Sequence, residues 1–135
     1  MKVSIITVVR NNQSTIKDAI DSVIRQTYKN IEYIVIDGAS TDGTIDVIEK
    51  YQDKISVFLS EPDNGLYDAL NKGIKLASGD VIAILHSDDL FSDRFVVSDM
   101  IERMVVENAE IAFSDMVIVD NSMTKVLRHY MASYF

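Results

Sequence analysis

The sequence predicts an α/β domain whose mostly parallel sheet is flanked by helices. Short apolar runs rich in β-branched residues alternate along the chain with stretches that repeat apolar residues at helical spacing. Strands separated by helices form right-handed βαβ units, and such units build a parallel sheet. With 135 residues the chain has room for one hydrophobic core, so we expect residues 1–135 to form a single domain.

The first two predicted elements display this pattern. Residues 3–9 are almost continuously apolar, as is typical of a strand that is covered on both faces. The apolar residues that follow recur at i, i+3, i+4, i+7 and i+8, which is one stripe of an amphipathic helix. The members of the stripe are Ile16, Ala19, Ile20, Val23 and Ile24. Thr15, with Asp18 three residues later, fits a capping box at the start of this helix.

The same alternation continues along the rest of the chain. Further strands are expected at 31–36, 55–59, 81–85 and 111–119, and further helices at 44–51, 66–77 and 93–106. Gly79 follows the third of these helices, where a left-handed helix end would favour glycine.

The composition excludes several classes of protein. The chain has 21 acidic and 13 basic residues and a net charge of −8, so no basic face is available for nucleic acid. It has no cysteine, which excludes a disulfide framework, a cysteine-ligated zinc and a cysteine nucleophile. No apolar run approaches the roughly 20 residues of a membrane span, and the N-terminus has no signal-peptide cleavage site. We therefore expect a cytoplasmic protein without a transmembrane segment or a nucleic-acid partner.

Polar residues gather directly after four of the predicted strands. In open parallel sheets, ligands bind beyond the carboxyl ends of the strands, so these segments form the candidate site. The segments are 10–12, 37–43, 61–65 and 86–89. Three of the four contain clustered carboxylates, which indicates that the strand ends together bind a ligand.

The segment after the 81–85 strand is the candidate metal site. Asp88 and Asp89 repel each other, and a divalent cation would relieve the repulsion. Oxygen ligands suit Mg²⁺ or Mn²⁺, which commonly use one or two carboxylates plus the phosphates of a substrate. Alternatively, these carboxylates complement the macrodipole of the helix that follows. Neither His86 nor His129 is placed with a serine nucleophile, so a hydrolase triad has no support.

The other strand ends each allow a structural and a functional interpretation. Asp37 can accept hydrogen bonds from a ligand, whereas Ser40, Thr41 and Asp42 are explained by loop hydrogen bonds and helix capping. Arg10 is either a phosphate ligand or a solvated side chain. No Gly-x-Gly-x-x-Gly fingerprint or phosphate-binding Gly-x-x-x-x-Gly-Lys-[Ser/Thr] loop is present.

The segment 63–73 is the third cluster. Asp63 or Asn64 can cap the following helix, and Ala69 and Gly73 are small enough to let that helix pack closely on the sheet. Asn71 either supports the loop or meets a ligand.

Taken together, these motifs resemble glycosyltransferase family 2 in order and spacing, from residue 3 to about residue 120. The resemblance rests on the segments 3–7, 35–44, 64–73, 78–80 and 87–89. It implies the Rossmann-like GT-A nucleotide-diphospho-sugar fold and an inverting transfer from a nucleotide-sugar donor. The run from Glu61 to Gly73 is similar to bacterial members that build lipopolysaccharide, capsule and exopolysaccharide.

The resemblance also implies roles for particular residues. The nucleotide-sugar-binding residues would be Thr7, Val9, Arg10, Asn11, Asp37, Asn64, Gly65, Ser87 and Asp88. Asp88 and Asp89 would hold Mg²⁺ or Mn²⁺, which bridges the donor diphosphate. Family habit favours a UDP-sugar donor and a glycan or lipid-linked acceptor, with peripheral contact at the inner face of the membrane.

The chain also departs from the family pattern. Gly38 replaces a common acidic residue, Arg10 replaces an aromatic ring, and His86 stands where Asp or Asn is usual. Members continue into an acceptor-binding half that supplies the catalytic base, and neither Asp115 nor Asp120 clearly matches that base. No catalytic residue is therefore assigned.

From the length and the apolar end at 134–135 we expect a truncated chain with an exposed apolar edge that self-associates. The alternative function is a non-catalytic nucleotide-binding or interaction module. A flavodoxin-like or receiver domain is disfavoured, because receivers carry acidic residues after the first strand, where this chain has residues 10–12.

Overall fold

The computed structural model describes residues 1–132, so the apolar pair at 134–135 lies outside the described residues. The chain divides into two compact units, Met1–Asp99 and Met100–Phe135. The strands are β1 (Val3–Val9), β2 (Ile31–Asp37), β3 (Val57–Ser60), β4 (Val81–Ile84), β5 (Met116–Val119) and β6 (Val126–Tyr130). The helices are α1 (Ile16–Ile24), α2 (Thr44–Glu49), α3 (Leu66–Leu76) and α4 (Val96–Glu107).

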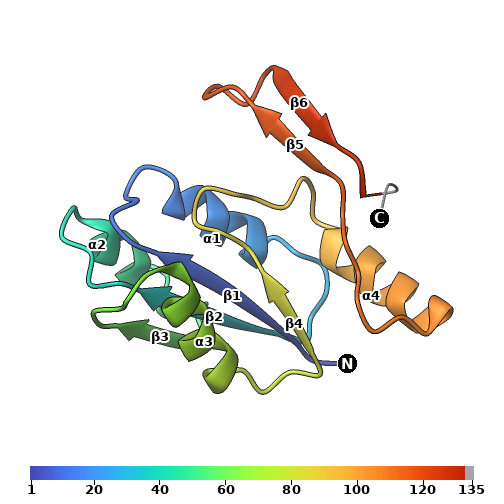
Figure 1. Cartoon of the computed structure of the whole chain (residues 1–135), viewed down its shortest axis with the longest axis horizontal. Helices are drawn as coiled ribbons and strands as arrows, with labels where there is room; N and C mark the ends of the chain where they lie inside the picture. The colour runs from blue at the N-terminus through green and yellow to red at the C-terminus, as the bar shows by residue number, and fades with distance from the viewer. Residues whose placement is uncertain (133–135) are drawn as a thin grey trace. The chain divides into compact units, whose positions relative to one another are not determined.

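The first unit is built on a parallel four-stranded sheet in the order β3-β2-β1-β4 (Figure 1). All seven residues of β1 are buried, as expected of a central strand in a sheet covered on both faces. The α/β fold class with a mostly parallel sheet is thereby confirmed.

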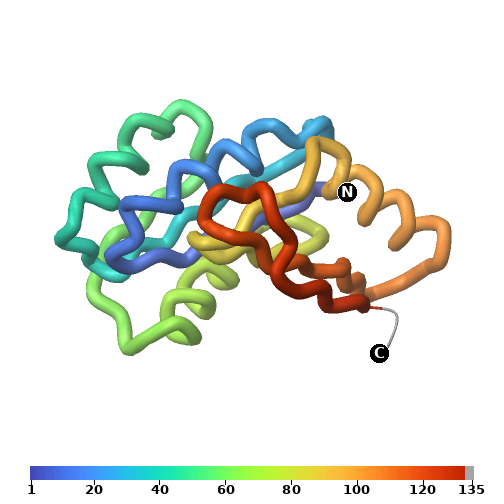
Figure 2. Tube along the Cα trace, turned by 90° about the horizontal axis from the view of Figure 1, so that it is seen from above, coloured from blue at the N-terminus to red at the C-terminus, as the bar shows by residue number. Residues whose placement is uncertain are grey.

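Helices cover both faces of this sheet. α1 and α2 lie on one face and α3 on the other, as the two sides of the view in Figure 2 show. The chain runs outward from β1 through β2 to β3 and then returns across the sheet to β4. Because each crossover is right-handed, reversing the direction moves the connecting helix to the opposite face. The direction changes between β1 and β4, which is where sheets of this kind bind ligands.

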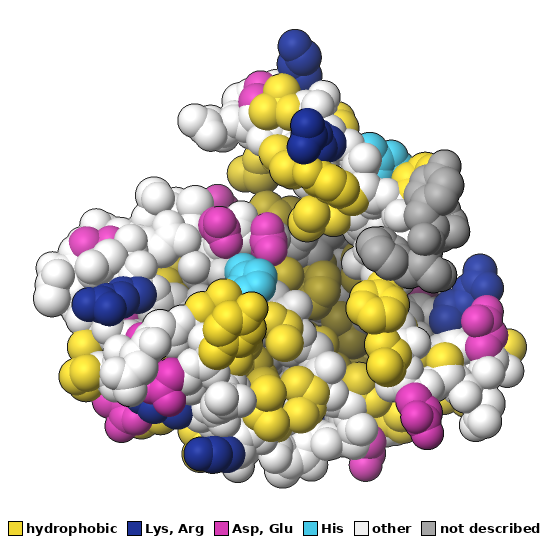
Figure 3. Space-filling model, in the orientation of Figure 1, with side chains coloured by type: hydrophobic (Ala, Val, Ile, Leu, Met, Phe, Trp, Pro, Cys, Tyr) yellow, Lys and Arg dark blue, Asp and Glu magenta, His cyan; other side chains and the backbone are white. Residues whose placement is uncertain are grey.

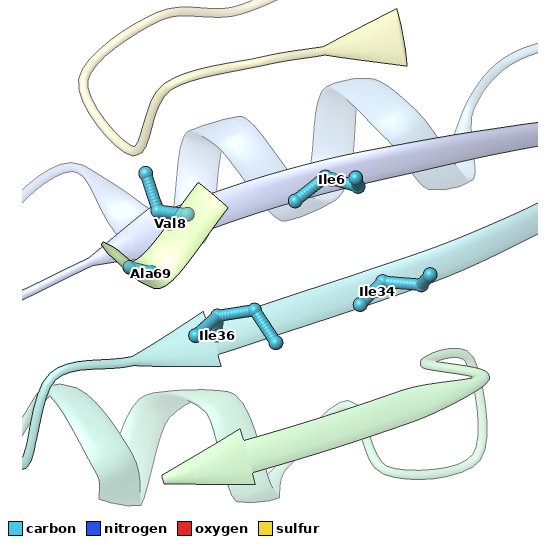
Figure 4. Packing of buried hydrophobic residues seen from close by; sticks show 5 residues of the cluster. All are labelled: Ile6, Val8, Ile34, Ile36 and Ala69. Atoms are coloured by element: carbon cyan, nitrogen blue, oxygen red, sulfur yellow. The ribbon is translucent and has the colours of Figure 1, made fainter. Parts of the chain in front are cut away.

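The core below α3 depends on small residues. Ile6 and Val8 of β1 and Ile34 and Ile36 of β2 pack together with Ala69 of α3 (Figure 4). A Cβ atom on Gly73 would lie 2.6 Å from Ile6 Cγ2. The expected close packing of this helix through Ala69 and Gly73 is confirmed.

The Glu32 carboxylate, at the start of β2, joins three chain segments at the edge of the sheet where the strands begin. It accepts hydrogen bonds from Lys2 Nζ (2.8 Å), Ser4 Oγ (2.6 Å), and the N–H (2.8 Å) and hydroxyl (2.6 Å) of Ser78. The Lys2 ammonium, with the Ser4 and Ser78 donors, lowers the pKa of Glu32 to about 2. This clamp fastens the loop before β4 to β1 and β2.

Two local predictions are wrong. Thr15 makes no capping hydrogen bond at α1; its hydroxyl donates to the Ser87 carbonyl instead (2.8 Å). Gly79 does not adopt a left-handed conformation. A Cβ atom there would lie 2.7 Å from the Ser4 backbone nitrogen, so the residue permits close approach of two chain segments.

The predicted boundaries after β4 also need correction. The helix begins at Val96 rather than 93, because Asp93 Oδ1 accepts the Phe95 N–H (2.7 Å) in the preceding turn. The fifth strand is shorter than 111–119 and pairs antiparallel with β6, which the periodicity did not predict. A hairpin needs no helical crossover, so the alternation that identified the parallel strands ends here.

Within residues 1–132, no helix has both the length and the apolar character that crossing a membrane requires.

Candidate functional site

The candidate site lies at the carboxyl edge of the four-stranded sheet, within the first unit. It consists of the segments that follow β1, β2, β3 and β4. These are the segments that the sequence predicts, and hydrogen bonds join several of them.

The segment after β1 is fastened to the segment after β2. Asn11 has a φ of 50°, a left-handed conformation that asparagine tolerates. Its N–H donates to Ser40 Oγ (2.8 Å), and its side-chain oxygen accepts the Thr41 N–H (2.8 Å). Asn12 N–H donates to Thr44 Oγ1 (2.9 Å). Asn11 thus supports this edge with both its backbone and its side chain.

The same segment is fastened to the end of β4, on the other side of the switch point. Asn12 Nδ2 donates to Ser87 Oγ (3.0 Å), and Thr15 donates to the Ser87 carbonyl. Ser87 is buried by these contacts. The structure therefore brings residues 10–12 and 87–89, which are far apart in the sequence, to one edge. Asn12 and Thr15 are site-supporting residues that the motif comparison missed.

Asp37 is completely buried at the end of β2. Its Oδ2 accepts the Ser40 N–H (3.0 Å) and the Ser60 hydroxyl (2.7 Å), and its Oδ1 accepts the Ser40 hydroxyl. Ser60 was not among the residues predicted from the sequence. The signal that could have found it is the parallel register, which pairs Asp37 with Ser60.

Two of the proposed nucleotide-binding residues have buried side chains in β1. Thr7 is fully buried, and its Oγ1 accepts the Tyr33 hydroxyl (3.1 Å). Burial raises the pKa of Tyr33 to about 12, so this hydroxyl stays protonated. Val9 is 5% exposed. The residues of this segment with exposed side chains are Arg10 and Asn11.

A tight turn holds Asn64 and Gly65 at the start of α3. Gly65 N–H donates to Asp63 Oδ1 (2.9 Å), and Asn64 N–H donates to Asp68 Oδ2 (3.0 Å). Gly65 has a φ of +104°, which disfavours any residue with a side chain. Lys72 Nζ braces the turn by donating to the Pro62 carbonyl (2.9 Å).

The acidic pair after β4 is exposed. Partial shielding of its carboxylate raises the pKa of Asp89, Asp88 raises it further, and His86 lowers it. Within residues 1–132, no group of three or more His, Cys, Asp or Glu side chains is arranged to hold a metal ion. Two carboxylates fit Mg²⁺ or Mn²⁺ when a substrate diphosphate completes the coordination, so the donor set agrees with a metal bound together with its substrate.

The two later carboxylates considered for the catalytic base are both engaged in the second unit. The Ala132 N–H and the His129 ring nitrogen hold the pKa of Asp115 below its usual value. The Ser122 hydroxyl and the Lys125 and Thr124 N–H groups lower the pKa of Asp120, which closes the turn between β5 and β6. Both carboxylates therefore stabilise the hairpin.

The parallel sheet carries polar loops at its β1–β4 switch point, which is the position where open α/β sheets bind ligands. The chain belongs to glycosyl transferase family 2, because the model of that family matches residues 4–134.

Curated relatives agree with this family. An uncharacterized glycosyltransferase of Mycobacterium tuberculosis is 41% identical over 103 residues, which are 76% of this chain and 39% of the relative. The Escherichia coli protein named UDP-Glc:alpha-D-GlcNAc-diphosphoundecaprenol beta-1,3-glucosyltransferase WfaP is 38% identical over 84% of this chain and 45% of its own length. This chain therefore spans about two fifths of the length of these relatives.

Solved structures show the same fold. S. aureus TarS (residues 1–349), in a complex with UDP-GlcNAc, matches with a TM-score of 0.73 at 26% identity, covering 80% of this chain and 32% of TarS. The mannosyltransferase PcManGT of Pyrobaculum calidifontis, in complex with GDP-Man and Mn²⁺, matches with a TM-score of 0.72 at 22% identity, covering 91% of this chain and 36% of PcManGT. The predicted GT-A fold is thereby confirmed.

Proposed function

We propose that this chain carries the donor-binding part of an inverting glycosyltransferase that uses a nucleotide-diphosphate sugar, with UDP as the nucleotide. The observation that carries the proposal is the hydrogen-bonded edge that joins the segment after β1 to the end of β4. Arg10 follows β1 on this edge and Asp88 and Asp89 follow β4, which supports a donor site at the switch point. The UDP and UDP-GlcNAc complexes of TarS support UDP as the nucleotide.

Each segment of the proposed site contacts a different part of the nucleotide-sugar donor. Arg10 binds the diphosphate through its guanidinium, which matches phosphate geometry. Asn11 and Ser87 lie beneath the donor. Thr7 and Val9 contact the donor through the backbone of β1. The residues that border the nucleoside are Asp37, Asn64 and Gly65. Asp88 and Asp89 would hold Mg²⁺ or Mn²⁺ together with oxygens of the substrate. When bound, this cation neutralises the charge that grows on the leaving group.

The acceptor is a glycan or a lipid-linked sugar in cell-surface polysaccharide synthesis. The names of WfaP and of the Bacillus subtilis relative TuaG, a putative teichuronic acid biosynthesis glycosyltransferase, support this class. The reaction would take place in the cytoplasm at the inner face of the membrane. Inversion requires a carboxylate that removes the proton of the acceptor hydroxyl. That base is not assigned to any residue of this chain.

Calorimetric titration tests the proposal. UDP, GDP and dTDP are each titrated into the chain with and without Mn²⁺. Mn²⁺-dependent binding of UDP in preference to the others is expected. If none of the three nucleotides binds, the donor-site proposal is wrong, and the non-catalytic interaction module becomes the better interpretation.

The exposed apolar surface of the first unit leads to a prediction about association. β4 is an edge strand among the described residues, and Ile82 and Ile84 are 44% and 49% exposed. Leu66, Tyr67 and Ile74 of α3 are also exposed, and Figure 3 shows hydrophobic side chains gathered over this side of the sheet. Apolar patches of this kind, next to an open strand edge, favour association.

We expect concentration-dependent self-association in sedimentation velocity, and we expect Ile82→Lys/Ile84→Lys to shift the chain toward the monomer. Val105→Lys/Val106→Lys, at exposed α4 positions, is the matched control with the same added charge. A chain that stays monomeric at all concentrations would contradict the prediction. Equal effects of the two double variants would also contradict it.

A further inference from the structure

Gly38 leaves room at the carboxyl edge of β2 for a carboxylate from another segment. A Cβ atom on Gly38 would collide with Asp63 Oδ2 and would lie 3.2 Å from Asp63 Cγ. The Asp63 carboxylate therefore occupies the space that a side chain at position 38 would take. The Arg10 side chain reaches the same place, with its Cδ 3.4 Å from the position of that Cβ.

The two oxygens of Asp63 have different surroundings. Oδ1 accepts the Gly65 N–H (2.9 Å) and so holds the turn before α3. Within residues 1–132, no hydrogen bond or ion pair reaches Oδ2, and the side chain is only half-buried. A carboxylate oxygen can accept more than one hydrogen bond, so Oδ2 keeps its full capacity for a ligand.

The neighbouring carboxylate, Asp37, has hydrogen bonds to both of its oxygens. It is completely buried, and three hydrogen bonds from Ser40 and Ser60 engage both of its oxygens. Asp37 thus shapes the loop after β2, while Asp63 presents an unengaged acceptor beside it.

We propose that Asp63 is a further donor-site residue that accepts a hydrogen bond from the nucleoside and so determines preference for a nucleotide over a bare diphosphate. This inference rests on the proposed function. A carboxylate accepts from O–H and N–H groups, which the ribose hydroxyls and the uracil ring provide and a diphosphate lacks. Arg10, whose Cδ lies next to the same position, meets the phosphates. The negative charge of Asp63 thus suits the hydrogen-bond donors of the nucleoside, and the positive charge of Arg10 suits the diphosphate.

Asp63→Asn and Gly38→Ala test this role by different routes. Asp63→Asn keeps an oxygen for the Gly65 N–H and replaces the other acceptor with a donor. Gly38→Ala keeps the carboxylate but pushes it away from the edge, because only the flexible end of Asp63 has to move. Asp46→Asn, at an exposed position of α2 outside the site, is the matched control, since it also removes one carboxylate charge.

The affinities of UDP, 2′-deoxy-UDP and inorganic pyrophosphate are measured by calorimetry with Mn²⁺. We expect Asp63→Asn to weaken UDP binding about tenfold, in the range for a lost hydrogen bond to a charged group. Pyrophosphate binding by Asp63→Asn, and UDP binding by Asp46→Asn, should change less than twofold. Gly38→Ala should weaken UDP binding by a similar factor. The double variant should bind UDP only slightly more weakly than either single variant, because both changes remove the same contact. A smaller loss for 2′-deoxy-UDP assigns the contact to the 2′-hydroxyl, and an equal loss assigns it to another nucleoside donor.

Three results would overturn the inference while leaving the proposed function intact. They are unchanged UDP binding by Asp63→Asn, equal losses for UDP and pyrophosphate, and additive effects of the two substitutions. If the unaltered chain binds no nucleotide, the proposed function fails and the inference fails with it. Thermal unfolding of each variant separates loss of binding from loss of fold.

Discussion

Replacing Asp88 and Asp89 together by asparagine is expected to abolish the Mn²⁺ dependence of UDP binding. Asparagine keeps the size of each side chain but removes both charges, so a cation is no longer attracted to the end of β4. Loss of a charge partner of this kind commonly costs about 2 kcal/mol or more, roughly a 30-fold change in affinity. Calorimetric titration of UDP with and without Mn²⁺ measures the effect.

The control for this prediction is Asp46→Asn/Asp53→Asn, which removes the same charge from exposed positions outside the site. It should bind UDP as the unaltered chain does. The helix-dipole alternative does not apply, because α4 begins only at Val96. If Asp88 and Asp89 only support the segment after β4, the double variant will change the unfolding temperature and leave binding unchanged. That outcome would contradict the metal assignment.

The largest effect on stability is expected from Glu32→Gln at neutral pH. A glutamate carboxyl ordinarily has a pKa near 4.5. In the folded chain, the Lys2 ammonium and the hydrogen bonds from Ser4 and Ser78 lower the pKa of Glu32 to about 2. A lowered pKa means that the charged form stabilises the fold above about pH 4.5, and that this contribution is lost as the pH falls toward 2. The shift corresponds to about 3 kcal/mol. Solvent screens part of this interaction, because the Lys2 side chain is 37% exposed although that of Glu32 is 11% exposed.

Urea unfolding at a series of pH values between 2 and 7 measures this contribution. After allowance for screening, the free energy of unfolding of Glu32→Gln should lie about 2 kcal/mol below that of the unaltered chain at pH 7. The difference should shrink toward zero as the pH approaches 2. Glu49→Gln, at an exposed position of α2, is the control and should change stability by less than about 0.5 kcal/mol. A difference that is independent of pH would show that the charge of Glu32 does not stabilise the fold.

The clamp also matters for the site, although it lies at the opposite end of the sheet. It fastens the loop before β4, and Asp80 accepts the Lys2 N–H there (2.7 Å). β4 then runs in register beside β1, with Val3 opposite Val81 and Ile6 opposite Ile84. This register determines where Ser87, Asp88 and Asp89 emerge at the other edge.

The parallel core of the fold could be predicted because its signal is local. The apolar runs of β1 and β2 and the helical stripes of α1 and α3 are periodic, and burial requires that periodicity. The hairpin of β5 and β6 was only partly predicted, because its strands are exposed on both faces and lack an alternating pattern. Gly79 was misinterpreted, since a helix end and a close approach both favour glycine and only packing distinguishes them.

The sequence by itself determined the order of the strands and helices from β1 to β5, the family, and the strand ends as the place of the candidate site. These follow from periodicity, from motif spacing and from the rule that parallel strands end at one edge. The tertiary structure decided which side chains meet there. It buried Asp37 against Ser40 and Ser60, fastened Asn12 to Ser87 across 75 residues of chain, and brought Asp63 over Gly38. Such contacts depend on strand order and register, which juxtapose residues that no local pattern relates.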